Sequence, residues 1–284
     1  MSMARKLRED MKSGRLVVAP GAYDCVTARL VEAAGFGCVY MTGGGTAGTL
    51  GFPDYGLTTM SEMADNAGRL ARVLNVPLIA DADTGYGNEL NVTRTVREYE
   101  MRGVAAIQIE DQGFPKKCGH LQDKTIIPLN DFIRKIRAAA AARRNSDTII
   151  VARTDARGGA GFGEAVDRMN ASLEAGADVA FLEAHHSDEE MEQIPKLIKG
   201  PCLLNVGRFG KSPAPHLKRV ADMGYAIAIL PGMLLTHVIG SCEHMLKELR
   251  ETQAHPVPFR DLTIHELWRY CGAEEWDKVQ ERFK

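Results

Sequence analysis

A recurrent helix-stop signal divides this sequence, and it restricts the fold more than any other feature. Amphipathic stretches end in small residues followed by a glycine, and an apolar run begins within four residues of each glycine. Two further stretches end in a turn that contains proline. The glycines are Gly35, Gly103, Gly176 and Gly224, and the prolines are Pro77 and Pro201. The chain is therefore predicted to alternate between helix and strand.

Most of the apolar runs lack polar alternation, as expected for parallel strands that are buried on both faces. Eight such strands with helices between them, and no evident edge strand, favour a closed (β/α)8 TIM barrel over an open doubly wound sheet, which stays the alternative. We expect the barrel to occupy residues 1–254. The predicted strands are residues 16–19, 38–42, 78–83, 105–110, 148–153, 179–183, 202–205 and 226–230.

The last part of the chain lies outside this repeat. A helix is expected over residues 233–251, and the segment His255-Pro-Val-Pro258 ends it. Residues 255–284 then form a helical tail, with an apolar stripe over 261–284 that includes Trp268 and Trp276. A completed barrel cannot include this stripe, so it must pack on the outside of the barrel or on another subunit, and we favour the subunit.

Charge and composition exclude several classes of protein. The net charge is -2 at pH 7 and no long basic cluster occurs, which argues against a nucleic-acid partner and against a membrane surface. No apolar run reaches membrane-spanning length, and the charged N-terminal helix is not a signal peptide, so a cytoplasmic location is expected. The six cysteines are scattered, which fits reduced thiols better than disulfides or zinc. All except Cys118 are expected to fill the core.

Polar side chains recur at the carboxyl ends of the predicted strands, which in a barrel face one mouth. Asp24 alone reads best as a helix cap. Several carboxylates that converge without matching cations would repel one another, so a divalent ion is their natural partner, and oxygen ligands favour Mg²⁺ or Mn²⁺ over zinc. The residues are Asp24, Tyr40, Thr42, Asp81, Asp83, Glu110, Arg153, Glu183 and Asn205.

Two glycine-rich turns are predicted beside these residues. Thr42-Gly-Gly-Gly-Thr-Ala-Gly48 would let backbone N–H groups approach an anion, and it lacks the Lys-Ser/Thr of a nucleotide-binding P-loop. Thr84-Gly-Tyr-Gly-Asn88 turns sharply into the next helix. Arg153 adds a planar cation suited to a carboxylate. The site is therefore expected to bind a small, multiply anionic molecule.

One cysteine lies in a different setting from the others. Cys118 follows Lys116 and Lys117 and precedes His120 in a loop broken by Gly113, Pro115 and Gly119. Positive neighbours would favour its thiolate, although a surface turn with solvated lysines is the plainer interpretation.

Three segments together resemble the isocitrate lyase and phosphoenolpyruvate mutase superfamily, in its methylisocitrate and 2,3-dimethylmalate lyase branch. They are Asp81-Ala-Asp-Thr-Gly-Tyr-Gly-Asn88, Ile109-Glu-Asp-Gln112 and Lys116-Lys-Cys-Gly-His120. The resemblance covers essentially the whole barrel. It implies that family members exchange C-terminal helices within homotetramers, and that Cys118 is the catalytic acid on a gating loop. It further implies that Asp54, Asp81, Asp83 and Glu110 surround Mg²⁺, and that Arg153 and Glu183 are catalytic residues that line the pocket. The substrate is expected to meet Thr42, Gly43, Gly44, Asp81, Gly119, His120, Arg153 and Asn205.

This resemblance implies a lyase that cleaves a 2-hydroxy di- or tricarboxylate into a 2-oxo acid and a second carboxylate. Tyr40 is the candidate base for the hydroxyl proton. Arg208 departs from the family pattern, which has an acidic turn there, and it is equally a carboxylate contact or a solvent-facing residue. An oxaloacetate decarboxylase, a 2-oxo-dicarboxylate hydrolase and a non-catalytic binding protein stay open as alternatives.

Overall fold

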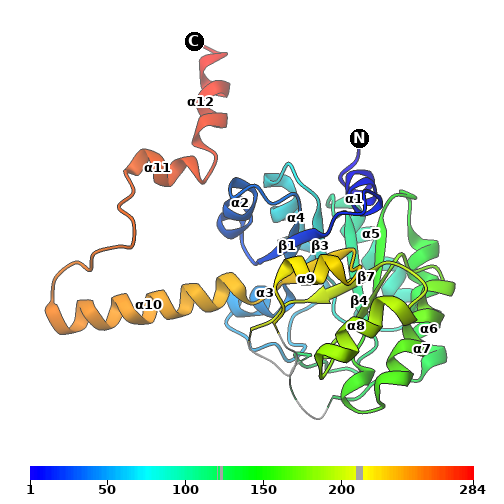
Figure 1. The fold of residues 1–284 in the computed structure, drawn as a ribbon. Helices are drawn as coiled ribbons and strands as arrows, with labels where there is room; N and C mark the ends of the chain where they lie inside the picture. The colour runs from blue at the N-terminus through cyan, green and yellow to red at the C-terminus, as the bar shows by residue number, and fades with distance from the viewer. Residues whose placement is uncertain (120, 122–123, 209–213) are drawn as a thin grey trace.

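The computed structural model of this chain describes residues 1–119, 121, 124–208 and 214–284. Its strands form one closed parallel barrel in sequence order, β1 to β8 (Figure 1). Closure is made by β1 and β8, where Val17 pairs with Ile227 and Pro20 with Leu230. The predicted barrel is confirmed and the open sheet is wrong. The strands are β1 Val17–Ala22, β2 Val39–Met41, β3 Leu78–Asp81, β4 Ala106–Glu110, β5 Ile149–Thr154, β6 Val179–Leu182, β7 Cys202–Asn205 and β8 Ile227–Leu230.

Apart from the C-terminal arm, the helices surround the barrel, and most begin where the sequence supplies a capping residue. Asp24 caps α2 with a reciprocal capping box, as predicted, and Thr59 does the same for α4. A 3-10 turn covers Ala156–Gly158. The helices are α1 Met3–Lys12, α2 Cys25–Ala33, α3 Gly43–Thr49, α4 Met60–Val73, α5 Glu89–Met101, α6 Leu129–Ala142, α7 Phe162–Glu174, α8 Asp188–Leu197, α9 Leu217–Asp222, α10 Met233–Thr252, α11 Ile264–Arg269 and α12 Ala273–Glu281.

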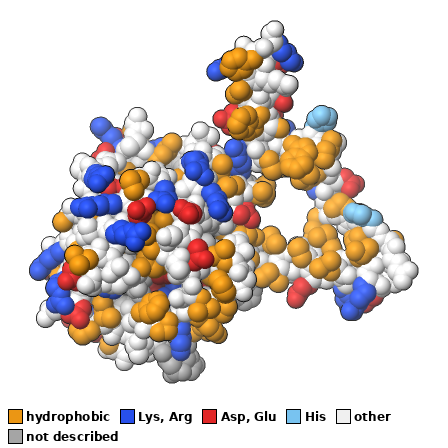
Figure 2. Space-filling model, turned by 180° about the vertical axis from the view of Figure 1, so that it is seen from behind, with side chains coloured by type: hydrophobic (Ala, Val, Ile, Leu, Met, Phe, Trp, Pro, Cys, Tyr) orange, Lys and Arg blue, Asp and Glu red, His pale blue; other side chains and the backbone are white. Residues whose placement is uncertain are grey.

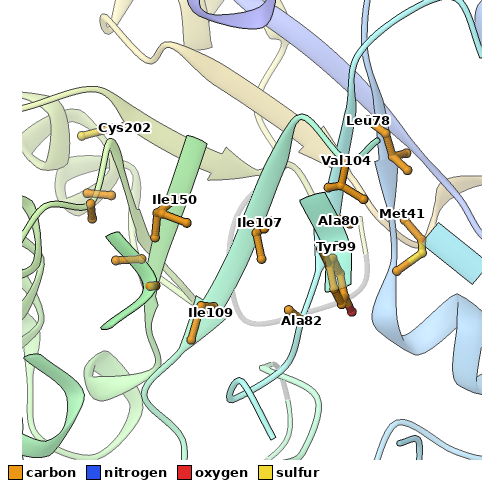
Figure 3. Packing of buried hydrophobic residues seen from close by; sticks show 14 of the residues in the cluster. Met41, Leu78, Ala80, Ala82, Tyr99, Val104, Ile107, Ile109, Ile150 and Cys202 are labelled. Carbon is orange, nitrogen blue, oxygen red and sulfur yellow. The ribbon is translucent and has the colours of Figure 1, made fainter. Parts of the chain in front are cut away.

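Two apolar layers hold the barrel. The larger lies between strands and helices, where side chains such as Met41, Ile107 and Ile150 pack outward from the sheet (Figure 3). The smaller fills the barrel interior and includes Leu7, which is fully buried, from α1. Strand side chains alternate between these two layers, so both faces are buried and the runs read as continuously apolar. The interior is packed below and polar only toward the carboxyl ends of the strands.

The C-terminal tail does not pack as the rest of the chain does. Helix α10 projects away from the barrel, and α11 and α12 return toward α2 (Figure 1). Arg29 Nη2 of α2 lies 4.0 Å from Glu275 Oε2 of α12. Apolar side chains gather on this arm in the view of Figure 2, and none of the residues in its three helices is buried. Trp276 and Phe283, for example, are 70% and 85% exposed.

The structure tests what the sequence predicts for the cysteines and for membrane-spanning helices. All six cysteines lie within the described residues and are present as thiols, and Cys38 and Cys202 are buried. Cys242 and Cys271 are exposed, so the prediction that they fill the core is wrong; both lie on the projecting arm, where an apolar sequence context did not lead to burial. None of the described helices combines the length and the apolar character needed to cross a bilayer.

Candidate active site

The polar residues at the carboxyl ends of the strands gather around a cavity of about 570 Å³. Gly43, Asp83 and Glu110 lie close beneath it, because Gly43 and Asp83 contact Asp81 and Glu110 contacts Arg153. His120 was also predicted to contact the substrate, and it lies outside the described residues. The predicted residues on the cavity wall are Tyr40, Thr42, Gly44, Asp54, Asp81, Cys118, Gly119, Arg153, Glu183 and Asn205.

Lys116 is an ion-pair partner of the predicted metal ligands. Its side chain is 4% exposed, and its Nζ lies 2.5 Å from Asp54 Oδ1 and 2.7 Å from Asp83 Oδ1. Burial lowers the pKa of Lys116, but the surrounding carboxylates, Asp83 first, outweigh it and raise that pKa well above its ordinary value. Lys116 therefore stays charged here. The sequence placed this lysine beside Cys118 and missed its true partners.

Arg153 is the second buried cation of the site. Its Nε and Nη2 donate to Asp155 Oδ2 and Oδ1 at 3.0 and 3.2 Å, and its Nη1 lies 3.2 Å from Glu110 Oε2. The guanidinium also stands 5.4 Å from the ring centre of Phe181. Glu183 Oε2 lies 3.8 Å away. This fork of contacts fixes the plane of the guanidinium on the cavity wall.

The expectation that the carboxylates lack matching cations is therefore wrong, since Lys116 and Arg153 lie among them. Within the described residues, no three His, Cys, Asp or Glu side chains are arranged as a ready metal site. The physical reason is that the amine of Lys116 reaches between Asp54 and Asp83 from a loop more than 30 residues from either.

These two cations do not fully offset the cost of ionising the buried carboxyl groups. Burial raises the pKa of Glu110 well above its usual range and that of Asp83 to about 6. Neither oxygen of Glu110 accepts a hydrogen bond from a described residue. Oδ1 of Asp83 lies 2.7 Å from Lys116 Nζ and accepts no hydrogen bond from any other described residue. Buried carboxylate oxygens with spare capacity are the donors that Mg²⁺ prefers, so these residues fit a divalent ion.

Tyr40 is buried beside these carboxylates, at the wall of the cavity. Its hydroxyl donates to Gln108 Oε1 at 3.0 Å, and Gln108 Nε2 donates to Asp81 Oδ1 at 3.2 Å. Burial raises the pKa of Tyr40 well above its ordinary value. This setting favours the neutral phenol, a hydrogen-bond donor, over the anion that would take up a proton. Gln108 was missed, although it lies two residues before Glu110 on β4 and so shares its inward face.

The glycine stretch after β2 is a helix, α3, and the prediction of a turn is wrong. Thr42 caps this helix, its Oγ1 accepting from Gly45 N at 3.4 Å. Gly43 N donates to Asp81 Oδ2 at 3.3 Å, and a Cβ on Gly43 would lie 2.5 Å from the same oxygen. The glycines therefore allow a close approach of helix and carboxylate instead of opening the backbone.

Cys118 reaches the cavity from the loop that follows β4. Its backbone N–H donates to the carbonyl oxygen of Asp54 at 3.1 Å. Gln112 holds the preceding residue at both polar backbone atoms, accepting from Lys117 N at 3.0 Å and donating to Lys117 O at 2.8 Å. The cysteine is partly exposed, as a residue that acts on a ligand in the cavity must be.

Residues from β6 and from the segment after β8 add apolar surface to the cavity wall. Phe181 comes from β6, and residues after β8 continue into the first turn of α10, where Leu235 and His237 line the cavity. Arg208 also lines it. The sequence did not assign α10 to the site, because its pattern predicts only the last outer helix of the barrel.

Comparison with known proteins identifies the family to which this chain belongs. The family model described as phosphoenolpyruvate phosphomutase matches residues 7–250. The chain is 47% identical over 273 residues to the 2-methylisocitrate lyase of Aeropyrum pernix, covering 96% of this chain and 88% of that protein. The chain belongs to the phosphoenolpyruvate mutase and isocitrate lyase superfamily. It is also 47% identical over 232 residues to the 2,3-dimethylmalate lyase of Eubacterium barkeri, covering 81% of this chain and 80% of that protein.

Solved structures agree with this membership. A crystal structure of 2,3-dimethylmalate lyase superposes with a TM-score of 0.95 at 37% identity, over 99% of this chain and 95% of that one. An oxaloacetate acetylhydrolase bound to 3,3-difluorooxalacetate gives a TM-score of 0.95 at 36% identity, over 99% and 96%. A phosphonopyruvate hydrolase in complex with oxalate and Mg²⁺ gives 0.90 at 30% identity, over 100% and 99%.

Proposed function

We propose that this protein is a carbon–carbon lyase that cleaves a 2-hydroxy di- or tricarboxylate of the 2-methylisocitrate or 2,3-dimethylmalate type. The products are a 2-oxo acid, pyruvate for these substrates, and a second carboxylate. The observation that carries the proposal is the placement of Cys118 on one cavity with Arg153 and the buried carboxylates. The 47% identity to two such lyases supports the same reaction.

Substrate binding is assigned to the two sides of the cavity. Thr42 and Gly44 would hold one carboxylate, while Gly43 supports them through its bond to Asp81. Arg153 would face the carboxylate that accumulates charge as the bond breaks. Gly119, His120, Glu183 and Asn205 complete the proposed binding set, in which Asn205 Nδ2 donates to Glu183 Oε2 at 3.2 Å.

A magnesium ion, or manganese in its place, would be held by Asp54, Asp81, Asp83 and Glu110, some of them through water. When bound, this ion lowers the pKa of the substrate hydroxyl. The oxygens of Glu110, which accept no hydrogen bond from a described residue, support the assignment. Lys116 would keep the remaining carboxylate charge balanced.

The proton movements follow from the bond that breaks. The hydroxyl loses its proton to a base, the C2–C3 electron pair passes to C3, and the resulting enediolate takes a proton from the thiol of Cys118. Tyr40, the base expected from the sequence, is better suited to holding Gln108 and Asp81 in place, because its environment favours the neutral phenol.

A substrate panel tests the proposal. The lyase should release pyruvate and a saturated carboxylate from 2-methylisocitrate or 2,3-dimethylmalate. Carbon dioxide from oxaloacetate would identify a decarboxylase instead, and oxalate with acetate would identify a hydrolase like the structurally similar acetylhydrolase. Tight binding of these acids without turnover would identify a binding protein. Any of these last three results would overturn the lyase assignment.

We also propose that residues 255–284 and α10 pack on a second copy of the chain, with exchanged helices in a homotetramer. The support is the apolar surface of the projecting arm, since contiguous exposed apolar area on this scale marks an interface. The exposed side chains of Val238, Leu246 and Leu249 are spaced eight and three residues apart, so they form one apolar stripe along α10 that requires cover. The cytoplasmic location stays a prediction of the sequence.

A further inference from the structure

The loop that carries Cys118 is held to the barrel on two sides. On one side, Asp54 and Gln112 bond the backbone of residues 117 and 118. On the other side, the loop is held by the side chain of one lysine. Lys124 Nζ donates to the carbonyl oxygen of Gly119 and to the carboxylate of Asp155.

Lys124 is not a solvated surface lysine. Its side chain is 6% exposed and that of Asp155 is fully buried. Burying an ammonium group is costly unless it is paired and hydrogen-bonded, and both conditions are met here. The pair joins the Cys118 loop to the end of β5, 31 positions further along the chain.

Asp155 is in turn held in place by hydrogen bonds to Asp111. Its backbone N–H donates to Asp111 Oδ1 at 2.9 Å, and Thr154 Oγ1 donates to Asp111 Oδ2 at 2.6 Å. Arg168 Nη1 reaches the same carboxylate at 3.2 Å. Burial would raise the pKa of Asp155, but Arg153 and Lys124 lower it to about 2, so the carboxylate stays charged. Asp155 is therefore a fixed anchor between two cations.

The same carboxylate orients Arg153 through its fork of two hydrogen bonds. Gly119 lies directly on this arginine: a Cβ at Gly119 would be 2.4 Å from Arg153 Nη2 and 2.7 Å from Glu183 Cγ. The peptide after Cys118 is thus pressed onto the guanidinium, with Lys124 tying its carbonyl to the carboxylate that holds that guanidinium.

We propose that Lys124 and Asp155 are positioning residues that hold the Cys118 thiol and the Arg153 guanidinium in a fixed arrangement relative to each other. Neither touches the cavity in its own right. Their role in turnover rests on the proposed function, since it assumes that Cys118 and Arg153 act on substrate. Their effect on the location of the thiol does not depend on the reaction.

The test is Lys124→Met in the full-length protein with Mg²⁺ present. Methionine keeps the length of the side chain and removes the charge and the donors. Lys124→Arg restores both in a longer group, and the exposed Lys218→Met controls for the loss of one lysine elsewhere. Each protein is treated with iodoacetamide without substrate, and the rate of alkylation at each cysteine is followed by peptide mass spectrometry.

The chain supplies its own references for this measurement. Cys242 and Cys271 lie on the projecting arm, so whatever cover a second copy gives them, their alkylation should be the same in every variant, whereas Cys38 and Cys202 are buried and report loss of the whole fold. We expect alkylation of Cys118 to change by at least about 10-fold in Lys124→Met, with Cys38 and Cys202 still protected. Lys124→Arg should return part of the way to wild type.

Turnover gives the second measurement. Misplacing a catalytic group by about 1 Å costs roughly 10²-fold, so kcat of Lys124→Met should fall by about that factor, with a much smaller change in KM. Unchanged Cys118 alkylation would overturn the proposal, and so would a parallel rise at Cys38 and Cys202. If Cys118 responds but wild type cleaves no member of the substrate panel, the positioning role stands and the lyase assignment falls.

Discussion

The ammonium nitrogen of Lys116 lies 2.7 Å from Oδ1 of Asp83, inside the group of carboxylates assigned to a metal ion. Without a metal ion, a lysine at this point reduces the repulsion among the carboxylates. With a metal ion bound, it would share the balancing of their negative charge. The carboxylates are therefore partners of a lysine as well as candidate metal ligands. Removal of Lys116 should reveal how much of the repulsion among them this lysine offsets.

Lys116→Met should lower the free energy of unfolding by about 3–5 kcal/mol in EDTA, because it leaves buried carboxylates without their cation. Added Mg²⁺ should then stabilise the variant more than wild type, since the ion replaces part of the lost charge. Urea denaturation with and without Mg²⁺ measures both effects, with Lys218→Met as the control. An equal Mg²⁺ effect in variant and wild type would show that Lys116 and the ion do not share these carboxylates.

Chelation should abolish turnover, and Mg²⁺ or Mn²⁺ should restore it. The reason is the set of carboxylate oxygens around Asp83 and Glu110, which have spare capacity for a hard cation. The measurement is the rate on the best substrate of the panel, after EDTA treatment and dialysis, against added metal. Full activity in a rigorously metal-free preparation would contradict the magnesium assignment.

Cys118→Ser should reduce kcat by about 10²–10⁴-fold, the usual cost of losing a general acid, with KM largely kept. The hydroxyl differs from the thiol by one atom, so the loop and the cavity should be undisturbed. Steady-state kinetics on an alkylmalate, beside the rate on oxaloacetate, measures the effect. If the serine variant cleaves the alkylmalate within a few-fold of wild type, Cys118 is not the acid.

Gly119→Ala should reduce kcat by roughly 10²-fold, because its methyl group would collide with Arg153 and Glu183 and displace the loop. Arg153 cannot yield freely, since Asp155 and Glu110 hold its guanidinium. Gly158→Ala is the matched control: a methyl group at this position would meet no described atom within 4 Å, and the activity of the variant should match wild type. Equal kinetics for the two variants would refute the close seating of Gly119.

Truncation after Pro258 should lower the oligomeric state or make the protein insoluble, because the apolar surface that the tail covers in the assembly becomes exposed. Analytical ultracentrifugation of the truncated and full-length chains measures the change, and thermal melting follows the stability. A truncated protein with the sedimentation coefficient of the corresponding tetramer and an unchanged melting temperature would refute the exchanged tail.

The sequence by itself determined the barrel. Helix stops at residues such as Gly103 and Gly176 and continuous apolar strands are local signals, each set by backbone conformation and burial within a few residues. Strand order then followed, because eight parallel strands close in only one simple way. Since carboxyl ends share one mouth, the sequence also brought Asp81, Glu110 and Arg153 to one site.

Only the tertiary structure decided which side chains in that mouth are partners. Asp54 and Lys116 are 62 positions apart, and Lys124 and Asp155 are 31 apart, so their contacts depend on where two loops meet and not on any local pattern. The neutral setting of Tyr40 likewise arises from burial by several strands at once. Interactions between residues that are close in sequence specify the helices, the strands and the point where each strand ends. The distance between two loop side chains is set instead by the packing of the whole barrel.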